Sequence, residues 1–276
     1  MNFVYFGTPD FAADILSVLV RAGMAPCAVV TNPDRPAGRK KIMTPSPVKA
    51  AALGFGAGID MLQPEAFDAA FVASLRAYGA EVGVLAAYGK IVPPEVFNIF
   101  PKGIVVVHPS LLPKYRGATP IQSAILSGDP ETGTTLFLMD GKVDHGGIIA
   151  SRAVPIDGID SYASLAKKLA AASADLLVEN LPAYVSGAVV PSAQDEAGAS
   201  YTKKFATPDA FVDLETTDSE KICRMARALN PEPGAWTMKD GKRMKILEAE
   251  RGSDGKLILK KIQFEGGKPQ ALFEAK

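Results

Sequence analysis

The sequence has 276 residues, enough for one large or two ordinary domains, and 47% of them are apolar, which is ample for a sizeable core. Thirty basic and thirty acidic residues give a formal net charge of zero. The overall charge therefore does not attract a polyanion, and any polyanion would have to bind to local basic patches. Cys27 and Cys223 form no zinc pattern, and neither a secretory leader nor a run of about 18 apolar residues occurs, so we expect free cysteines, no metal and a cytoplasmic location.

The chain opens with an expected strand at 3–6, a turn at 7–9 and a helix from Asp10 to about Ala22. Apolar residues of this helix recur on one face. A strand, a glycine and a helix N-terminus are typical of nucleotide sites. The GxGxxG pattern is missing, however, so we set dinucleotides aside.

A second expected strand, 27–31, is followed by a segment that four prolines and a glycine predict to be irregular over some fifteen residues. Basic side chains gather at its centre: Arg35, Arg39, Lys40 and Lys41. The segment is either a solvated charged loop or a binding loop. A helix at 67–78 and a strand at 82–86 follow.

The next apolar run, 104–107, is typical of a strand buried on both faces of a parallel sheet, and it ends at His108. Ligands of open α/β sheets bind at the carboxyl edge, where this imidazole is expected. A strand at 134–139 leads into a glycine-rich loop that contains Asp144. A carboxylate beside His108 would favour the charged form of the imidazole and orient it for general acid–base catalysis. The alternative is a core histidine whose ring is hydrogen-bonded to the backbone.

Further helices are expected at 119–127 and 161–185, with a strand at 148–155. Alternating strands and helices over about 190 residues predict an α/β, Rossmann-like, doubly wound and mostly parallel sheet. Composition then shifts, and we expect a catalytic domain at 1–190, a linker at 191–205 and a small domain at 206–276.

The small domain is predicted to contain a helix at 218–229 and strands at 236–239, 244–247 and 257–262, with a hairpin turn at Asp240-Gly241. Helix plus short strands fits a small barrel. From Lys239 to the end there are ten basic and six acidic residues, so the tail is basic. A solvated surface is the simplest interpretation of such a tail.

The stretches HPSLLPKYRG, TPIQSAILSGDPETGTTL and MDGKVDHGG closely resemble the formyltetrahydrofolate-dependent formyltransferases. The resemblance implies that His108 and Asp144 are catalytic and that 10-formyltetrahydrofolate donates the formyl group. It also implies a folate site made of the following residues: Ser110, Leu111, Leu112, Pro113, Tyr88, Ile91, Val92 and Asp140. For Tyr88 and its neighbours, ordinary core is an equal alternative.

Two more stretches, DRPAGR…K…PSPVK and NPEPGAWTMKDGKRMKI, resemble the branch of this family that formylates methionyl-tRNA. The resemblance implies initiator methionyl-tRNA as acceptor and an OB-like C-terminal barrel, which we expect to be shortened here. We also expect a monomer. The resemblance further implies tRNA contacts from these residues: Arg35, Arg39, Lys40, Lys41, Lys242 and Arg243. Transfer to an amino sugar nucleotide or to glycinamide ribonucleotide is the rival within the enzyme class.

One position departs from the family pattern, which has an asparagine two residues before the histidine. This chain has Val106 there. An amide at that position would donate to the oxyanion of the tetrahedral intermediate, and an isopropyl group cannot. The sequence therefore predicts impaired transfer, and a relative that binds folate or tRNA without turnover is the alternative from another class.

Overall fold

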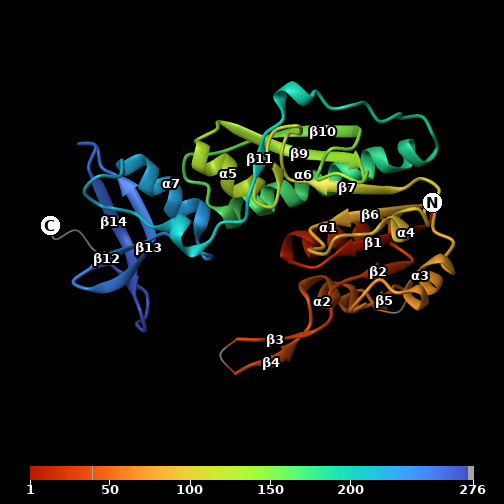
Figure 1. Cartoon of the computed structure of the whole chain (residues 1–276), viewed down its shortest axis with the longest axis horizontal. Helices are drawn as coiled ribbons and strands as arrows, with labels where there is room; N and C mark the ends of the chain where they lie inside the picture. Colours follow the sequence, from red (N-terminus) through yellow and green to blue (C-terminus); the bar gives the residue numbers. More distant parts are fainter. Residues whose placement is uncertain (39, 57, 273–276) are drawn as a thin grey trace. The chain divides into compact units, whose positions relative to one another are not determined.

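The computed structural model describes residues 1–38, 40–56 and 58–272 (Figure 1). The chain divides into two compact units. The first unit comprises Met1–Arg116, Gly133–Val154 and Ala166–Ser200, and the second comprises Gly117–Thr132, Pro155–Leu165 and the residues from Tyr201 onward.

A seven-stranded sheet forms the centre of the fold, in the order β10-β9-β7-β6-β1-β2-β5. Its strands are β1 (Phe3–Gly7), β2 (Ala28–Val30), β5 (Asp60–Leu62), β6 (Val82–Ala86), β7 (Ile104–His108), β9 (Glu131–Leu138) and β10 (Ile148–Pro155). The pairs β1–β2, β1–β6, β2–β5 and β6–β7 are parallel, whereas β7–β9 is antiparallel. The predicted α/β, mostly parallel sheet is thus confirmed, with an antiparallel pair toward one edge.

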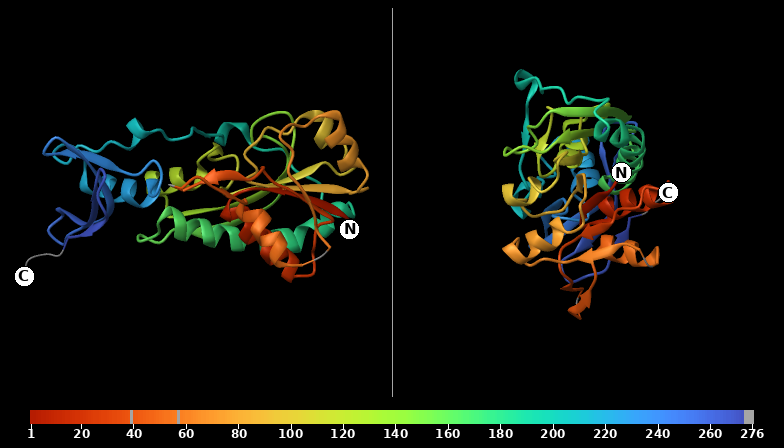
Figure 2. Two further views of the ribbon diagram at one scale, coloured as in Figure 1. Left: turned by 90° about the horizontal axis from the view of Figure 1, so that it is seen from below. Right: turned by 90° about the vertical axis from the view of Figure 1, so that its right-hand side faces the viewer.

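Side chains of these strands alternate between two apolar clusters, one on each face of the sheet. In β1, Phe3 and Tyr5 belong to one cluster, and Val4 and Phe6 to the other. The first cluster also receives α1 (Asp10–Arg21), α2 (Pro47–Gly54) and α6 (Tyr162–Val185), and the second receives α3 (Ala69–Arg76) and α4 (Pro94–Phe97) (Figure 2). Each fully buried aliphatic side chain contributes roughly 1.5–3 kcal/mol. This core fixes the strand ends that carry the site.

Local sequence signals set several helix ends. The Asp68 carboxylate accepts from the Phe71 backbone N–H at 2.8 Å and caps α3, and the Ser46 hydroxyl accepts from Lys49 N–H at 3.0 Å and caps α2. Such side-chain caps are worth about 1 kcal/mol each. The expected helices at 10–22, 67–78 and 161–185 are therefore present with bounds that differ by at most a turn.

The proline-rich segment after β2 corrects one expectation. It contains an antiparallel pair, β3 (Arg35–Ala37) and β4 (Ile42–Thr44), in which Pro36 lies opposite Met43. The prediction of an irregular loop was wrong. Proline cannot donate a backbone hydrogen bond, but it can still occupy a strand position at which no donor is required. A two-stranded ribbon has outward-facing positions where no N–H is needed, unlike the middle of a sheet.

The second unit contains a small antiparallel β domain, as expected. Its described strands form a sheet in the order β12-β13-β14-β15, with β12 (Trp236–Lys239), β13 (Lys242–Arg251), β14 (Leu257–Phe264) and β15 (Gln270–Ala271). The helices α5 (Pro120–Ser127) and α7 (Ser219–Leu229) belong to the same unit. Asp240 and Gly241 both have positive φ, 51° and 71°, so the predicted tight hairpin turn is present.

The remaining elements are short: β8 (Arg116–Gly117), β11 (Tyr201–Thr202), and single 3₁₀ turns at Glu196–Gly198 and Thr207–Ala210. None of the helices within the described ranges is long and apolar enough to cross a membrane.

Candidate active site

His108 is the last residue of β7, at the carboxyl end of the strand, as the sequence predicted. In β7, Val105 and Val107 point into the first cluster and Ile104 and Val106 into the second. Side chains along a strand alternate, so the imidazole lies on the same face as Val106. The His108 side chain is 7% exposed.

The two ring nitrogens of His108 face different partners. Nε2 lies 2.9 Å from the carbonyl oxygen of Tyr115. Because a carbonyl only accepts, this contact assigns the proton to Nε2 in the neutral ring. Nδ1 faces the Asp144 carboxylate, with 3.6 Å between Nδ1 and Oδ2. That distance is too long for a direct hydrogen bond, and the attraction is electrostatic. The carboxylate thus faces the nitrogen that carries no proton in the neutral ring.

Asp144 lies in the loop between β9 and β10, in a backbone conformation with φ of 46°. Aspartate tolerates this left-handed conformation better than most residues that have a Cβ. At Gly146 a side chain would overlap the Leu138 carbonyl, so the loop turns back closely on the end of β9. The end of this loop at Gly146 is thus packed closely against β9.

The turn Ser110–Pro113 follows the histidine after one intervening residue, Pro109. The Ser110 hydroxyl donates to the Lys114 carbonyl at 2.6 Å, and the Thr135 hydroxyl donates to the Ser110 carbonyl at 2.7 Å. Thr135 also accepts from the Leu112 N–H at 3.1 Å. This threonine of β9 ties the turn to the sheet. Sequence reasoning did not single it out, because its partners lie more than twenty residues away.

Val106 occupies the position, two residues before His108, at which the sequence resemblance leads us to expect an asparagine. It lies opposite Leu85 of β6 and Phe137 of β9, and it is 6% exposed. The same cluster contains Leu112, the third residue of the Ser110–Pro113 turn. The isopropyl group therefore packs against apolar neighbours on the same face as His108.

The other residues expected to bind folate lie in different environments. Tyr88 is 1% exposed and packs edge-on against Phe6, with ring centroids 5.8 Å apart, so its side chain is part of the core. Burial raises the Tyr88 pKa to about 12, which keeps the phenol neutral. Val92 is buried, whereas Ile91 is 93% exposed. Asp140 accepts from the His145 ring at 2.6 Å.

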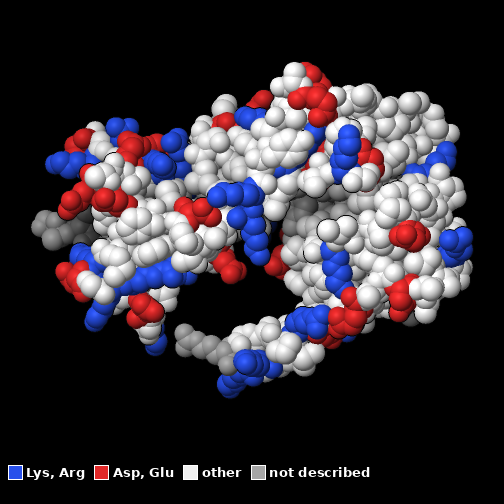
Figure 3. Space-filling model, viewed as in Figure 1, with Lys and Arg blue, Asp and Glu red and all other residues white. Residues whose placement is uncertain are grey.

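Basic residues expected to bind tRNA are found on both units (Figure 3). On the β3–β4 hairpin, Lys40 and Lys41 are exposed, and Arg35 forms an exposed ion pair with Glu65 at 2.7 Å. Arg39 lies outside the described residues. In the small β domain Lys242 is exposed, and the Arg243 guanidinium lies 4.5 Å from the centre of the Trp236 ring.

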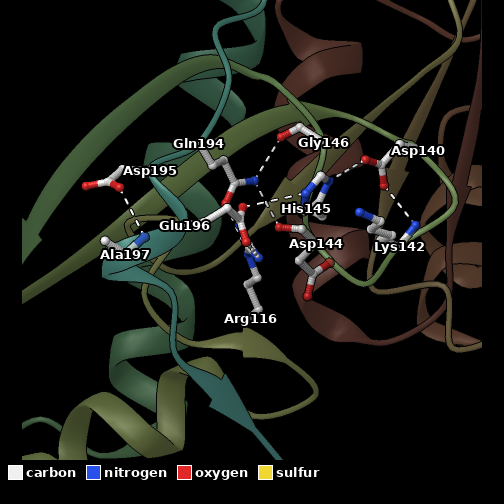
Figure 4. Close-up of polar contacts among 10 residues, drawn as sticks. All are labelled: Arg116, Asp140, Lys142, Asp144, His145, Gly146, Gln194, Asp195, Glu196 and Ala197. Carbon is white, nitrogen blue, oxygen red and sulfur yellow. Dashed lines mark hydrogen bonds and ion pairs between the residues drawn. The ribbon is translucent and has the colours of Figure 1, made fainter.

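A polar network beside the Asp144 loop was not foreseen (Figure 4). Arg116, whose side chain is fully buried, donates to Glu196 at 2.6 and 3.0 Å and to Gln194 at 2.8 and 3.1 Å. His145 joins it, with Nε2 3.6 Å from Glu196. Hydrogen bonds from Arg116 hold the pKa of Glu196 below its usual value. The Arg in YRG was a visible signal, but its partners some 80 residues downstream were not.

The sequence matches known protein families and is similar to known relatives. Residues 1–181 match the family described as "Formyl transferase", and residues 204–257 match "Formyl transferase, C-terminal domain". The methionyl-tRNA formyltransferase of Heliobacterium modesticaldum is 42% identical over 92% of this chain and 80% of its own length. That of Roseiflexus sp. is 45% identical over 90% of this chain and 76% of its own length.

Solved structures share the fold at low sequence identity. HypX from Aquifex aeolicus, in complex with tetrahydrofolic acid, gives a TM-score of 0.69 at 16% identity, covering 98% of this chain and 45% of HypX. Methionyl-tRNA formyltransferase from Clostridium thermocellum gives 0.63 at 18% identity, covering 96% and 99% of the two chains. A sugar N-formyltransferase from Shewanella sp. gives 0.64 at 17%, covering 94% and 95%. The fold is thus shared by proteins whose names state different acceptors.

Proposed function

The chain belongs to the formyl transferase family, and from this premise we propose that it transfers the formyl group of 10-formyltetrahydrofolate to the amino group of methionyl-initiator tRNA. The observation that carries the acceptor is the similarity to methionyl-tRNA formyltransferases, 42–45% identical over about nine tenths of the chain. This similarity extends into the small C-terminal domain, and the basic β3–β4 hairpin agrees with a polyanionic acceptor.

The proposed reaction is a direct acyl transfer. The neutral amine of the methionyl group attacks the formyl carbon, a C–N bond forms, and the carbonyl electron pair moves to oxygen. The tetrahedral intermediate then collapses, the C=O bond re-forms, and the bond to folate N10 breaks. The amine loses one proton overall and N10 gains one, so a group that moves between neutral and cationic forms assists both steps.

His108 is proposed to carry that proton. The Asp144 carboxylate, 3.6 Å from Nδ1, stabilises the cationic ring formed when the proton is taken up, and the Tyr115 carbonyl fixes the ring orientation from the other side. Because Nε2 carries the proton of the neutral ring and donates it to the Tyr115 carbonyl, Nδ1 is the nitrogen proposed to take up and release the transferred proton. Such a group contributes typically 10²–10⁴-fold.

Val106 is proposed to slow the reaction. Family members are expected to use an amide here as a donor to the developing oxyanion, and loss of one such donor costs roughly 10²–10³ in rate. The chain then keeps the acid–base pair and the fold but lacks one source of transition-state stabilisation. Binding of both substrates is expected to be retained.

The folate donor is proposed to lie against the Ser110–Pro113 turn, Asp140 and the segment around Tyr88, Ile91 and Val92. An isoleucine that is 93% exposed beside a buried valine offers an apolar contact at the carboxyl end of β6. Since the Tyr88 ring is in the core, its contribution would come from backbone atoms.

Contacts to tRNA are proposed for Arg35, Arg39, Lys40 and Lys41, and for Lys242 and Arg243 of the small domain. Phosphate contacts of this kind supply affinity and depend on salt. The division into a catalytic domain at 1–190, a linker at 191–205 and a tRNA-binding domain at 206–276 belongs to the same proposal. So do a monomeric state and a cytoplasmic location.

An acceptor panel tests the proposal. The natural chain is incubated with 10-formyltetrahydrofolate and, separately, with methionyl-initiator tRNA, an amino sugar nucleotide and glycinamide ribonucleotide, and N-formyl products are measured by mass spectrometry. We expect formylmethionyl-tRNA alone. Product from either small amine but not from methionyl-tRNA would assign another acceptor, and tight binding of folate without any product would assign a non-catalytic relative.

A further inference from the structure

We infer that Gln194 is a positioning residue for the reaction centre and acts by holding the Asp144 loop and, with the segment around it, both partners of His108. The expected effect on kcat rests on the proposed function, whereas the structural role of Gln194 does not. Gln194 is half-buried and comes from the segment Ser192–Ser200, which lies fifty residues downstream of the loop (Figure 4). We call this stretch the supporting segment.

The Gln194 amide binds the loop through its nitrogen. Nε2 donates to the Asp144 carbonyl at 2.9 Å and to the Gly146 carbonyl at 2.8 Å, one on each side of His145. A primary amide has two N–H groups, so both are used on this loop. The two bonds fix the backbone on either side of His145, next to the positive φ of Asp144.

Arg116 fixes which way the amide points. Its Nε and one terminal nitrogen both donate to Gln194 Oε1, at 3.1 and 2.8 Å. A guanidinium can only donate, so the amide oxygen must face Arg116 and the NH₂ group must face the loop. Glu196 accepts two further bonds from Arg116, which pairs this fully buried charge. The amide is therefore preorganised by charge-assisted hydrogen bonds.

The supporting segment also holds the second partner of His108. At its start, Ser192 and Ile148 exchange backbone bonds at 2.7 and 2.9 Å, just beyond the Asp144 loop. At its end, the Ser200 hydroxyl accepts from the Tyr115 N–H at 2.8 Å, and the Ser200 carbonyl accepts from the Arg116 N–H at 2.8 Å. Tyr115 is the residue whose carbonyl binds His108 Nε2.

One segment thus supports the carboxylate that faces Nδ1 and the carbonyl that faces Nε2. The loop itself has exposed residues at 141–143 and few buried ones, so it has little packing of its own to hold Asp144 in place. Since the 3.6 Å separation between His108 and Asp144 is already long, a further displacement would weaken their coupling.

The test replaces Gln194 with methionine, which keeps the length of the side chain and removes the amide. We expect kcat to fall roughly 10–100-fold, since a misplacement of about 1 Å can cost that much, with KM for both substrates within about twofold. Gln263→Met is the matched control. Gln263 is also half-buried and donates to a backbone carbonyl, that of Gly267 at 2.9 Å, but it lies in β14 of the small domain. Its kcat should stay within about twofold of the natural value.

Two readouts do not require turnover and keep this inference separate from the proposed function. Amide hydrogen exchange over residues 140–148 should accelerate in Gln194→Met and not in Gln263→Met. The chain has only two histidines, so ¹⁵N spectra of the imidazoles resolve His108, assigned with a His145→Gln variant. The His108 signals of Gln194→Met should move toward those of Asp144→Asn. Unchanged exchange together with natural His108 signals would overturn the inference, whether or not the chain formylates tRNA.

Discussion

Replacing Val106 with asparagine introduces into β7 the amide that the sequence resemblance implies at this position, on the face that carries His108. Alternate residues of a strand are about 6–7 Å apart, so side chains at 106 and 108 project side by side. An amide at 106 could therefore approach a substrate oxygen beside His108 at a hydrogen-bonding distance of about 3 Å. In the sheet, position 106 is paired with Leu85 on β6 and with Phe137 on β9.

Two effects of the substitution oppose each other. An added oxyanion donor is worth on the order of 10²–10³ in kcat, because it acts mainly on charge that develops in the transition state. Without substrate, the amide would be buried among Leu112, Phe137 and Tyr88, and an unpaired buried polar group costs about 1–3 kcal/mol. For a chain of this size that corresponds to a loss of roughly 2–10 °C in Tm.

Formylation of methionyl-tRNA is measured for the natural chain and for Val106→Asn, with KM for both substrates and Tm by calorimetry. We expect kcat to rise by about 10²-fold or more, little change in KM, and a lower Tm. Val106→Thr keeps the side-chain volume and adds a shorter hydroxyl donor, so a gain that appears only with asparagine assigns the effect to the longer reach of the amide. A Val106→Asn variant that binds folate, stays folded and gains no activity would refute the missing-donor account.

Other substitutions test the remaining parts of the site. His108→Ala and Asp144→Asn should each abolish transfer while lowering Tm by only a few degrees, and undiminished turnover in the His108 variant would contradict its assignment. Lys40→Glu and Lys41→Glu should weaken methionyl-tRNA binding and leave folate binding unchanged. The slope of log affinity against log salt concentration should fall by about one unit for each lost phosphate contact. An affinity for methionyl-tRNA that depends on neither the salt concentration nor these charges would point to another acceptor. Hydrogen bonds from Arg116 lower the pKa of Glu196 from its ordinary value of 4.5, so its carboxylate stabilises the fold above that pH and the stabilisation is lost as the pH falls through the lower folded pKa. Between roughly pH 5 and pH 3, Tm should therefore fall more steeply for the natural chain than for Glu196→Gln, and parallel curves would show that this ion pair does not contribute.

Local patterns were enough to predict the elements that carry the site. The apolar run 104–107 is buried on both faces in β7, and this is why His108 could be placed at the carboxyl end of a strand. Asp144 could be placed in a loop after the next strand for the same reason. The antiparallel direction of β9 against β7 was not foreseen, because an apolar run does not encode the direction of its neighbour.

Contacts made by backbone atoms, and contacts between distant segments, were beyond sequence reasoning. The carbonyl of Tyr115, which binds His108 Nε2, carries no side-chain signal, and Gln194 is one of several polar residues in a stretch without regular structure. The two-stranded hairpin at Arg35–Thr44 was missed because proline content excludes a central strand but not an isolated ribbon. Tyr88 illustrates a third limit, since only the structure shows its ring inside the core.

The most direct test of the central claim is single-turnover transfer of a labelled formyl group from 10-formyltetrahydrofolate to methionyl-initiator tRNA by the natural chain in excess, with His108→Ala as the background. The account predicts slow formation of formylmethionyl-tRNA at a rate clearly above that background. Equal rates for the natural chain and the His108 variant, with both folded and saturated with both substrates, would contradict it.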